Sequence, residues 1–277
     1  MDIWVNILQI IKTSMTVPKP WGWFHILWLV ISIAAAFILF ITQKTDDDAR
    51  IRRVVVTVAV ISIVLEIYKQ ICFNFDLVDG ASVYHGYEWY AFPFQFCSLP
   101  MYVGLFCAFF KNKKILDMLY AFLATYSIFA GVCVMVYPVQ VFVGTLGINV
   151  QTMFCHGSMI TVGIYLLATK AVRTEHKTIL RAMPVFLVGM IMAIIMNELA
   201  YRGGVLEKNA FNMFYISPHS PSTLPVYSAI QPLVPYPVEL LLYFAAFSLA
   251  SYVLLLIAMG INRIINFVKQ GRKKANV

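Results

Sequence analysis

Two short stretches of the sequence contain the residue types that nucleophilic catalysis needs. The first, Phe92–Pro100, places Cys97 between two prolines at the start of an apolar run. The second, Thr152–Ser158, opens another apolar run and contains His156. A thiol becomes a strong nucleophile when an imidazole takes its proton, and a nearby helix N-terminus activates it further. The chemistry to consider is covalent catalysis by a Cys–His pair, provided that the two segments meet.

Both residues also have an ordinary structural interpretation. Most membrane cysteines are small buried hydrophobes. His156 is compatible with a core histidine that is hydrogen-bonded to Thr152 one helical turn earlier, or to Asn149 two turns earlier. Pro100 lacks a backbone N–H, so it either frees the carbonyl of Phe96 beside the thiol or kinks the helix. These alternatives stay open at the level of the sequence.

The composition indicates a membrane protein. Of the 277 residues, 61% are hydrophobic and 12% are charged, about half the charged share of a soluble domain. Apolar runs of roughly 20 residues, enough to cross the ~30 Å hydrocarbon layer, recur along the chain. The sequence therefore predicts an all-α, polytopic helical bundle that forms one membrane domain over residues 1–277.

We expect about seven transmembrane helices, preceded by an interfacial helix and lead-in at 1–20 and followed by a basic cytoplasmic tail at 261–277. Within the bundle at 21–260, the expected spans are 21–41, 54–75, 92–110, 115–137, 149–169, 185–202 and 237–260.

The basic residues predict the orientation of these spans. Sixteen of the 21 Lys and Arg residues fall in the connections after spans one, three and five or after span seven, and Lys69 lies inside span two. Because Lys and Arg concentrate in cytoplasmic loops, this split predicts an outside N-terminus and a cytoplasmic C-terminus in the cell (plasma) membrane. The net charge of +8 then serves topology, and no nucleic-acid partner is expected. The four basic residues expected outside are Lys12, Lys19, Arg202 and Lys208.

The cysteines and histidines do not suggest a metal centre. The five cysteines are odd in number and show no CxxC spacing, which argues against a disulfide framework or a zinc cluster. We expect no metal and no other cofactor.

Polar side chains inside the expected spans predict a pocket, because ionisable groups at membrane depth are costly. Cys97 and His156 lie five and seven residues from the outer ends of their spans, so their depths differ by only ~3 Å. Cys155 should point ~100° away from the His156 face. A pocket that opens to the outer leaflet is therefore predicted. Its other expected residues are Glu66, Lys69, Gln95, Thr152, Asn197, Glu198 and Glu239.

Two charged pairs in this set have a structural alternative. Glu66 and Lys69 are three residues apart on one helical face, which favours an ion pair. Glu198 and Arg202 have the spacing of an ordinary i,i+4 pair at the membrane interface.

Three segments together carry a resemblance to a known family. They are Phe94–Leu99, Phe154–Gly157, and the stretch that contains Asn212-Met213-Phe214, Pro221-Ser222 and Pro235-Tyr236-Pro237. These segments resemble the YwaF-like bacterial integral membrane proteins, a family that in turn resembles the animal transmembrane acyltransferases that remodel ether phospholipids.

The resemblance implies a Cys–His membrane acyltransferase. It assigns the nucleophile to Cys97, the base to His156 and a third position to Asn212, with Asn209 as the other possible register. Glu66 matches an acidic position in the second span. Gln95 stands where the family pattern has a histidine, so a second histidine is not expected here.

The predicted function is therefore a lipid acyltransferase or acyl hydrolase that works through a thioester, with membrane phospholipids as substrate. Asn212 would orient the imidazole or help to hold the oxyanion. A site ~8–10 Å below the outer surface matches the depth of phospholipid ester bonds. The alternative is a small-solute or ion-coupled transporter with a polar pocket around Glu66, Lys69 and His156, and a third possibility is an assembly role without pocket chemistry. The sequence leaves the oligomeric state open.

Overall fold

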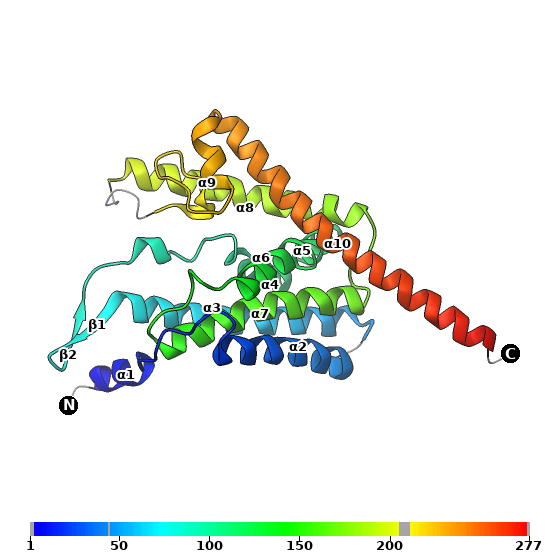
Figure 1. The fold of residues 1–277 in the computed structure, drawn as a ribbon, viewed down its shortest axis with the longest axis horizontal. Coiled ribbons are helices and arrows are strands. Elements are labelled where there is room, and N and C mark those ends of the chain that lie inside the picture. The colour runs from blue at the N-terminus through cyan, green and yellow to red at the C-terminus, as the bar shows by residue number, and fades with distance from the viewer. Residues whose placement is uncertain (1–2, 44, 205–210, 276–277) are drawn as a thin grey trace.

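The fold is that of a helical membrane bundle with one small hairpin (Figure 1). The computed structural model describes residues 3–43, 45–204 and 211–275. Side chains are described up to residue 270. The helices are α1 (Ile3–Ile11), α2 (Trp23–Gln43), α3 (Asp48–Asn74), α4 (Leu99–Phe109), α5 (Lys113–Leu123), α6 (Tyr126–Val136), α7 (Leu146–Ala168), α8 (Lys177–Arg202), α9 (Tyr227–Ile230) and α10 (Tyr236–Ala275), and the strands are β1 (Phe75–Val78) and β2 (Ala81–Tyr84).

Within the described residues, six helical segments are long and apolar enough to cross a membrane. They are α2, α3, the α5–α6 pair, α7, α8 and α10. The expectation of an all-α, multi-pass membrane protein is confirmed to this extent. The count of seven is not, because the third expected span, 92–110, is helical only over the 11 residues of α4. At 1.5 Å per residue α4 is ~16 Å long, about half the hydrocarbon thickness.

Proline placement explains why α4 begins so late. Pro93 disfavours helical backbone in the residue before it, and Phe92 is extended, with φ −51° and ψ 131°. Pro100 lies in the first turn of α4, where a missing N–H costs nothing. Because α4 starts at Leu99, Pro100 does not kink it, and the alternative, a Phe96 carbonyl freed by the missing N–H, remains a prediction. Residues 92–98 instead form an irregular segment that leads into α4.

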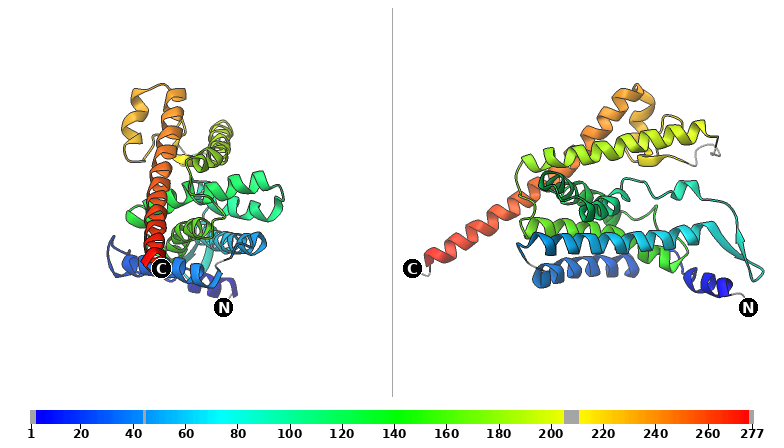
Figure 2. Two further views of the ribbon diagram at one scale, coloured as in Figure 1. Left: turned by 90° about the vertical axis from the view of Figure 1, so that its right-hand side faces the viewer. Right: turned by 180° about the vertical axis from the view of Figure 1, so that it is seen from behind.

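Helix α7 lies at the centre of the packing around the site. It packs against α2, α3 and α6, while α4 packs against α3, and α8 against α5 (Figures 1 and 2). Gly163 allows α7 to approach the α5–α6 junction, since a Cβ there would lie 2.8 Å from the carbonyl oxygen of Leu123. Close approach through small residues is typical of membrane helices.

The N-terminal helix and the hairpin lie together at one end of the bundle (Figure 1). Lys12 forms an ion pair with Asp76 of β1 at 2.5 Å, and Trp4 packs edge-on against Phe75 with ring centroids 5.5 Å apart. Ile10 of α1 is 74% exposed. The interfacial position of residues 1–20 remains a prediction.

The expected basic connections lie at the end of the bundle opposite the hairpin (Figure 1). Many of their Lys and Arg residues lie in the first turns of α3, α5 and α8. Of the predicted basic residues, Lys44 and Lys208 lie outside the described residues. The direction in which the bundle crosses the membrane remains a prediction.

Candidate active site

One cavity brings the two predicted catalytic residues together. It has a volume of about 170 Å³ and lies between α3, α4, the α5–α6 junction and α7. Cys97 and His156 both line it, and so do the predicted pocket residues Glu66, Lys69 and Thr152. The segments around Cys97 and His156 therefore face one common space, although they are far apart in the sequence.

The sequence argument placed Cys97 and His156 at similar depths in two full-length helices, and that premise is not what the structure shows. Cys97 precedes the first residue of α4 by two positions, whereas His156 lies ten residues into α7. Both line the cavity because the irregular segment 92–98 borders the same space as α7. Non-helical backbone at membrane depth is tolerated where it is covered by protein or lines a cavity, and this segment does both.

His156 has one nitrogen bound and one free. Its Nδ1 lies 2.7 Å from the main-chain oxygen of Thr152. A carbonyl oxygen only accepts hydrogen bonds, so Nδ1 carries the proton and Nε2 holds a lone pair. Nε2 is buried and has no hydrogen-bond partner among the described residues. Of the two structural interpretations, the bond to residue 152 is the one observed, since the Asn149 side chain binds Val143 instead.

Cys97 is half-buried at the N-terminal end of α4. That end carries the partial positive charge of the helix dipole, which favours a thiolate. The preceding residue, Phe96, packs against Phe186 and Phe247 with ring centroids 5.3 and 5.0 Å apart. These aromatic contacts fix the main chain next to the thiol.

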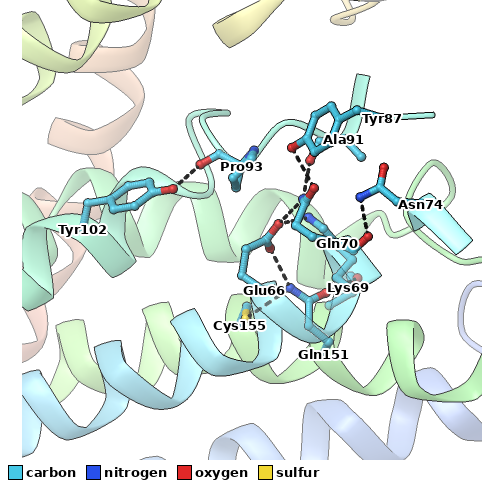
Figure 3. Close-up of polar contacts among 11 residues, drawn as sticks. Glu66, Lys69, Gln70, Asn74, Tyr87, Ala91, Pro93, Tyr102, Gln151 and Cys155 are labelled. Atoms are coloured by element: carbon cyan, nitrogen blue, oxygen red, sulfur yellow. Dashed lines mark hydrogen bonds and ion pairs between the residues drawn. The ribbon is translucent and has the colours of Figure 1, made fainter. Parts of the chain in front are cut away.

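Glu66 joins α3 to α7 beside the cavity (Figure 3). Its carboxylate pairs with Lys69 at 2.7 Å and accepts hydrogen bonds from Gln70 at 2.8 Å and Gln151 at 3.1 Å. The i,i+3 ion pair is therefore present. Gln151 was missed in the sequence, although a carboxamide at membrane depth one turn before Cys155 is a signal that could have identified it.

Cys155 also borders the cavity, contrary to the prediction that it would face away from His156. Its sulfur lies 3.6 Å from Nε2 of Gln151. Adjacent residues of α7 do point ~100° apart. The cavity is bordered by both α3 and α4, so both Cys155 and His156 line it. Two thiols thus face the same space, and only Cys97 also lies at a helix N-terminus.

The predicted residues of the third motif do not line this cavity. The Asn212 side chain accepts a hydrogen bond from the Ser217 N–H at 2.9 Å and donates to the Ser220 carbonyl at 3.3 Å. Its carboxamide is thus engaged within its own loop, and Nδ1 of His156 is held by the main chain instead. The alternative register at Asn209 lies outside the described residues.

Gln95 links the Cys97 segment to that loop. Its Nε2 donates to the Asn212 carbonyl at 3.0 Å, and its Oε1 accepts from the Phe214 N–H at 2.9 Å. On the other side, Asn197 of α8 holds both the N–H and the carbonyl of Met213, at 2.7 and 3.0 Å. Two carboxamides therefore clamp residues 212–214 beside the segment that bears the thiol.

The remaining predicted pocket residues stabilise the same loop between α8 and α10. Glu239, which is buried, accepts a 2.6 Å hydrogen bond from the Tyr227 hydroxyl. Glu198 pairs with Arg202 at 2.6 Å, as its i,i+4 spacing predicted, and contacts His219 at 2.8 Å. The predicted single polar pocket is thus two groups of residues, one around the cavity and one in the loop between α8 and α10.

The described part of the chain contains no cluster of three or more His, Cys, Asp or Glu side chains that is arranged to hold a metal ion. All five cysteines are free. The side chains that line the cavity include two thiols, an imidazole, a carboxylate and an ammonium group.

Comparison with known proteins gives one clear relationship. No curated protein and no solved structure matches the chain. The sequence profile of the TMEM164 family matches residues 20–265, which include all the cavity residues and the larger part of every candidate span. The YwaF-like relationship is not supported by these comparisons. The extent of the profile match shows that this multi-pass membrane protein belongs to the TMEM164 family.

Proposed function

We propose that the protein is a membrane-embedded lipid acyltransferase or acyl hydrolase, with Cys97 as nucleophile and His156 as base. The observation that carries the proposal is one cavity lined by a thiol and by an imidazole whose Nε2 is buried and unpartnered. Nδ1 carries its proton toward the Thr152 carbonyl. Nε2 is therefore unprotonated and can accept a proton. Burying a polar atom without a hydrogen-bond partner costs free energy, so such an atom calls for an explanation. Accepting the thiol proton during the reaction is the explanation proposed for Nε2.

Acylation of the enzyme begins with transfer of the Cys97 proton to Nε2 of His156. The thiolate then attacks the carbonyl carbon of a phospholipid ester and forms a C–S bond. When the tetrahedral intermediate collapses, the ester C–O bond breaks and the leaving lysophospholipid oxygen takes the proton from Nε2. The acyl group remains on Cys97 as a thioester.

The thioester is resolved by a second hydroxyl group. A lipid hydroxyl gives up its proton to Nε2 and attacks the thioester carbonyl, and the released thiolate recovers that proton. Water in the same role would give a free fatty acid. Much of the cavity wall is aliphatic, with Val55, Leu123 and Val162 among its residues, which limits water and favours transfer to a lipid.

Asn212 has an indirect role in this proposal. Its main-chain carbonyl accepts the hydrogen bond from Gln95, two residues before the thiol. Asn212 is therefore a positioning residue for the Cys97 segment rather than a group that touches the reacting atoms.

The test is the intact mass of the purified full-length protein after incubation with phosphatidylcholine and phosphatidylethanolamine vesicles. We expect a mass increase of one acyl group that is lost in Cys97→Ala and kept in Cys155→Ala, whose thiol lines the same cavity. Hydroxylamine should remove the adduct, because it cleaves thioesters. An adduct that persists in Cys97→Ala, or the lack of any adduct in the wild type, would contradict the proposal.

A further inference from the structure

A second cavity adjoins the candidate active site. Its volume is about 280 Å³, and it lies between α3 and the segment that leads into α4. Glu66 and Met101 line both cavities, so these two side chains form the wall between them. The lining consists of Ile63, Glu66, Ile67, Gln70, Ile71, Asn74, Phe75, Pro93, Met101 and Tyr102.

The α3 residues of this second cavity follow one stripe of the helix. From Ile63 to Asn74 they recur at alternating steps of three and one, which places them on one helical face. The stripe is ~17 Å long at 1.5 Å per residue, and Phe75, the first residue of β1, follows it. The cavity is therefore an elongated groove that runs from the depth of Glu66 toward the hairpin end of α3, and Figure 3 shows the polar side of this groove.

The polar side chains of the groove are already satisfied by the protein. Gln70 donates to Glu66 and to the Ala91 carbonyl, at 2.8 Å each, and accepts from Tyr87 at 2.7 Å. Asn74 donates to the Gln70 carbonyl at 2.6 Å and accepts from the Glu88 N–H at 2.9 Å, and Tyr102 donates to the Pro93 carbonyl at 2.7 Å. A polar solute would gain little from these groups, whereas the isoleucine side chains offer apolar contact.

The groove is open on one side and closed on the other. Ile67 is 56% exposed on the outer surface of the bundle, where a membrane protein contacts lipid, whereas Met101 is 9% exposed. Methionine is unbranched and has three rotatable bonds, so its side chain adapts readily to a neighbouring group. A chain that enters past Ile67 therefore meets a deformable wall with Cys97 on its far side.

We propose that the groove along Ile63, Ile67 and Ile71 binds one hydrocarbon chain of a membrane lipid and directs that lipid toward the Cys97 cavity. Its connection to catalysis rests on the proposed function, whereas binding of the chain does not. Two observations favour a lipid chain over a polar solute. The two cavities adjoin at Glu66 and Met101, and the polar side chains that line the groove are already hydrogen-bonded within the protein.

Photolabelling of the full-length protein tests this proposal without requiring turnover. The probe is phosphatidylcholine with a diazirine in one acyl chain, incorporated into phosphatidylcholine nanodiscs. We expect labelled peptides from 63–75 and 93–102, and a loss of about tenfold in Ile67→Trp, whose larger side chain fills the groove. Val64→Trp is the matched control, because Val64 is 58% exposed on the same helix and does not line the groove.

The results separate the groove from the catalytic proposal. Equal labelling in Ile67→Trp and Val64→Trp would overturn the groove even if wild-type Cys97 forms a thioester. Labelling that falls only in Ile67→Trp would support the groove even if no thioester forms, and the proposed function alone would then fail. If both proposals hold, Ile67→Trp also slows thioester formation more than Val64→Trp does.

Discussion

At the scale of single residues, the main-chain partner of His156 decides what each neighbour contributes. Nδ1 binds the carbonyl oxygen of Thr152 rather than its hydroxyl, and that hydroxyl instead lies 3.2 Å from Oε1 of Gln151. The orientation of the imidazole is therefore set by the α7 backbone. Removing the side chain at position 152 should leave the base in place.

We expect Thr152→Ala to form the acyl adduct within a few-fold of the wild-type rate, because the carbonyl that holds Nδ1 remains. His156→Ala should slow adduct formation ~10²–10⁴-fold, the usual contribution of general acid–base catalysis. The rates are measured by quenched-flow or manual quenching followed by intact mass. A loss in Thr152→Ala as large as that in His156→Ala would contradict the assigned tautomer.

The charged pair beside the cavity bears on the transporter alternative. Glu66 neutralises Lys69 and accepts two further hydrogen bonds from carboxamides. A carboxylate with all these partners is positioned to hold α3 against α7. Glu66, Lys69 and His156, the residues named for the transporter alternative, all line the cavity, so a transporter stays the alternative function.

At the scale of elements, the half-length α4 is the feature that makes a site possible. A continuous helix over 92–110 would have satisfied its own backbone and left Cys97 on a regular lipid-depth helix. The irregular segment needs partners for its own backbone, and the Tyr102 hydroxyl donates to the Pro93 carbonyl at 2.7 Å. The Gln95 side chain in turn satisfies the main chain of residues 212 and 214. Phe214 and Tyr215 both have φ of 59°, an uncommon conformation for residues of this size.

The Gln95 tether predicts a local change in stability. In Gln95→Ala the buried Phe214 N–H loses its acceptor, at a cost of ~1–3 kcal/mol. Hydrogen exchange of peptides within 211–220 should accelerate by about one to two orders of magnitude. Gln140→Ala, an exposed glutamine outside this contact, is the control. Unchanged exchange in Gln95→Ala would show that the aromatic contacts alone hold the loop.

At the scale of the whole molecule, the unequal distribution of Lys and Arg predicts which end of the bundle faces the cytoplasm. The hairpin end holds the irregular segments and the long loop, and the opposite end holds most of the basic residues (Figure 1). With this orientation the groove along α3, which runs toward the hairpin, extends toward the outer leaflet.

Cysteine labelling on intact cells tests this orientation. Asp79→Cys in the hairpin turn should react with a membrane-impermeant maleimide, whereas Asp46→Cys between α2 and α3 should react only after permeabilisation. Both positions are exposed. The background variant carries Cys133→Ser, because Cys133 is the exposed cysteine among the described residues. The reverse pattern would place the C-terminus outside and would contradict the Lys and Arg prediction.

The sequence by itself determined the class of the protein and its two candidate catalytic residues. Apolar runs of span length leave few structures other than helices, because backbone polar groups in lipid must be satisfied internally. An imidazole at membrane depth can be singled out without a structure, whereas Cys97 was distinguished from the other four cysteines by the family resemblance. The Glu66–Lys69 and Glu198–Arg202 pairs followed from helical spacing alone.

Tertiary structure decided what the residues do together. Spacing along one helix does not reveal which helices are neighbours, so the role of Gln151, the tether through Gln95 and the position of Asn212 in its own loop could not be predicted. The late start of α4 was also hidden, since a run as apolar as 92–110 fits a full span until its prolines and the contacts of residues 92–98 are considered. Cys97 and His156 line one cavity because residues 92–98 are not part of a regular helix and pack, through Phe96, against Phe129 of α6, Phe186 of α8 and Phe247 of α10.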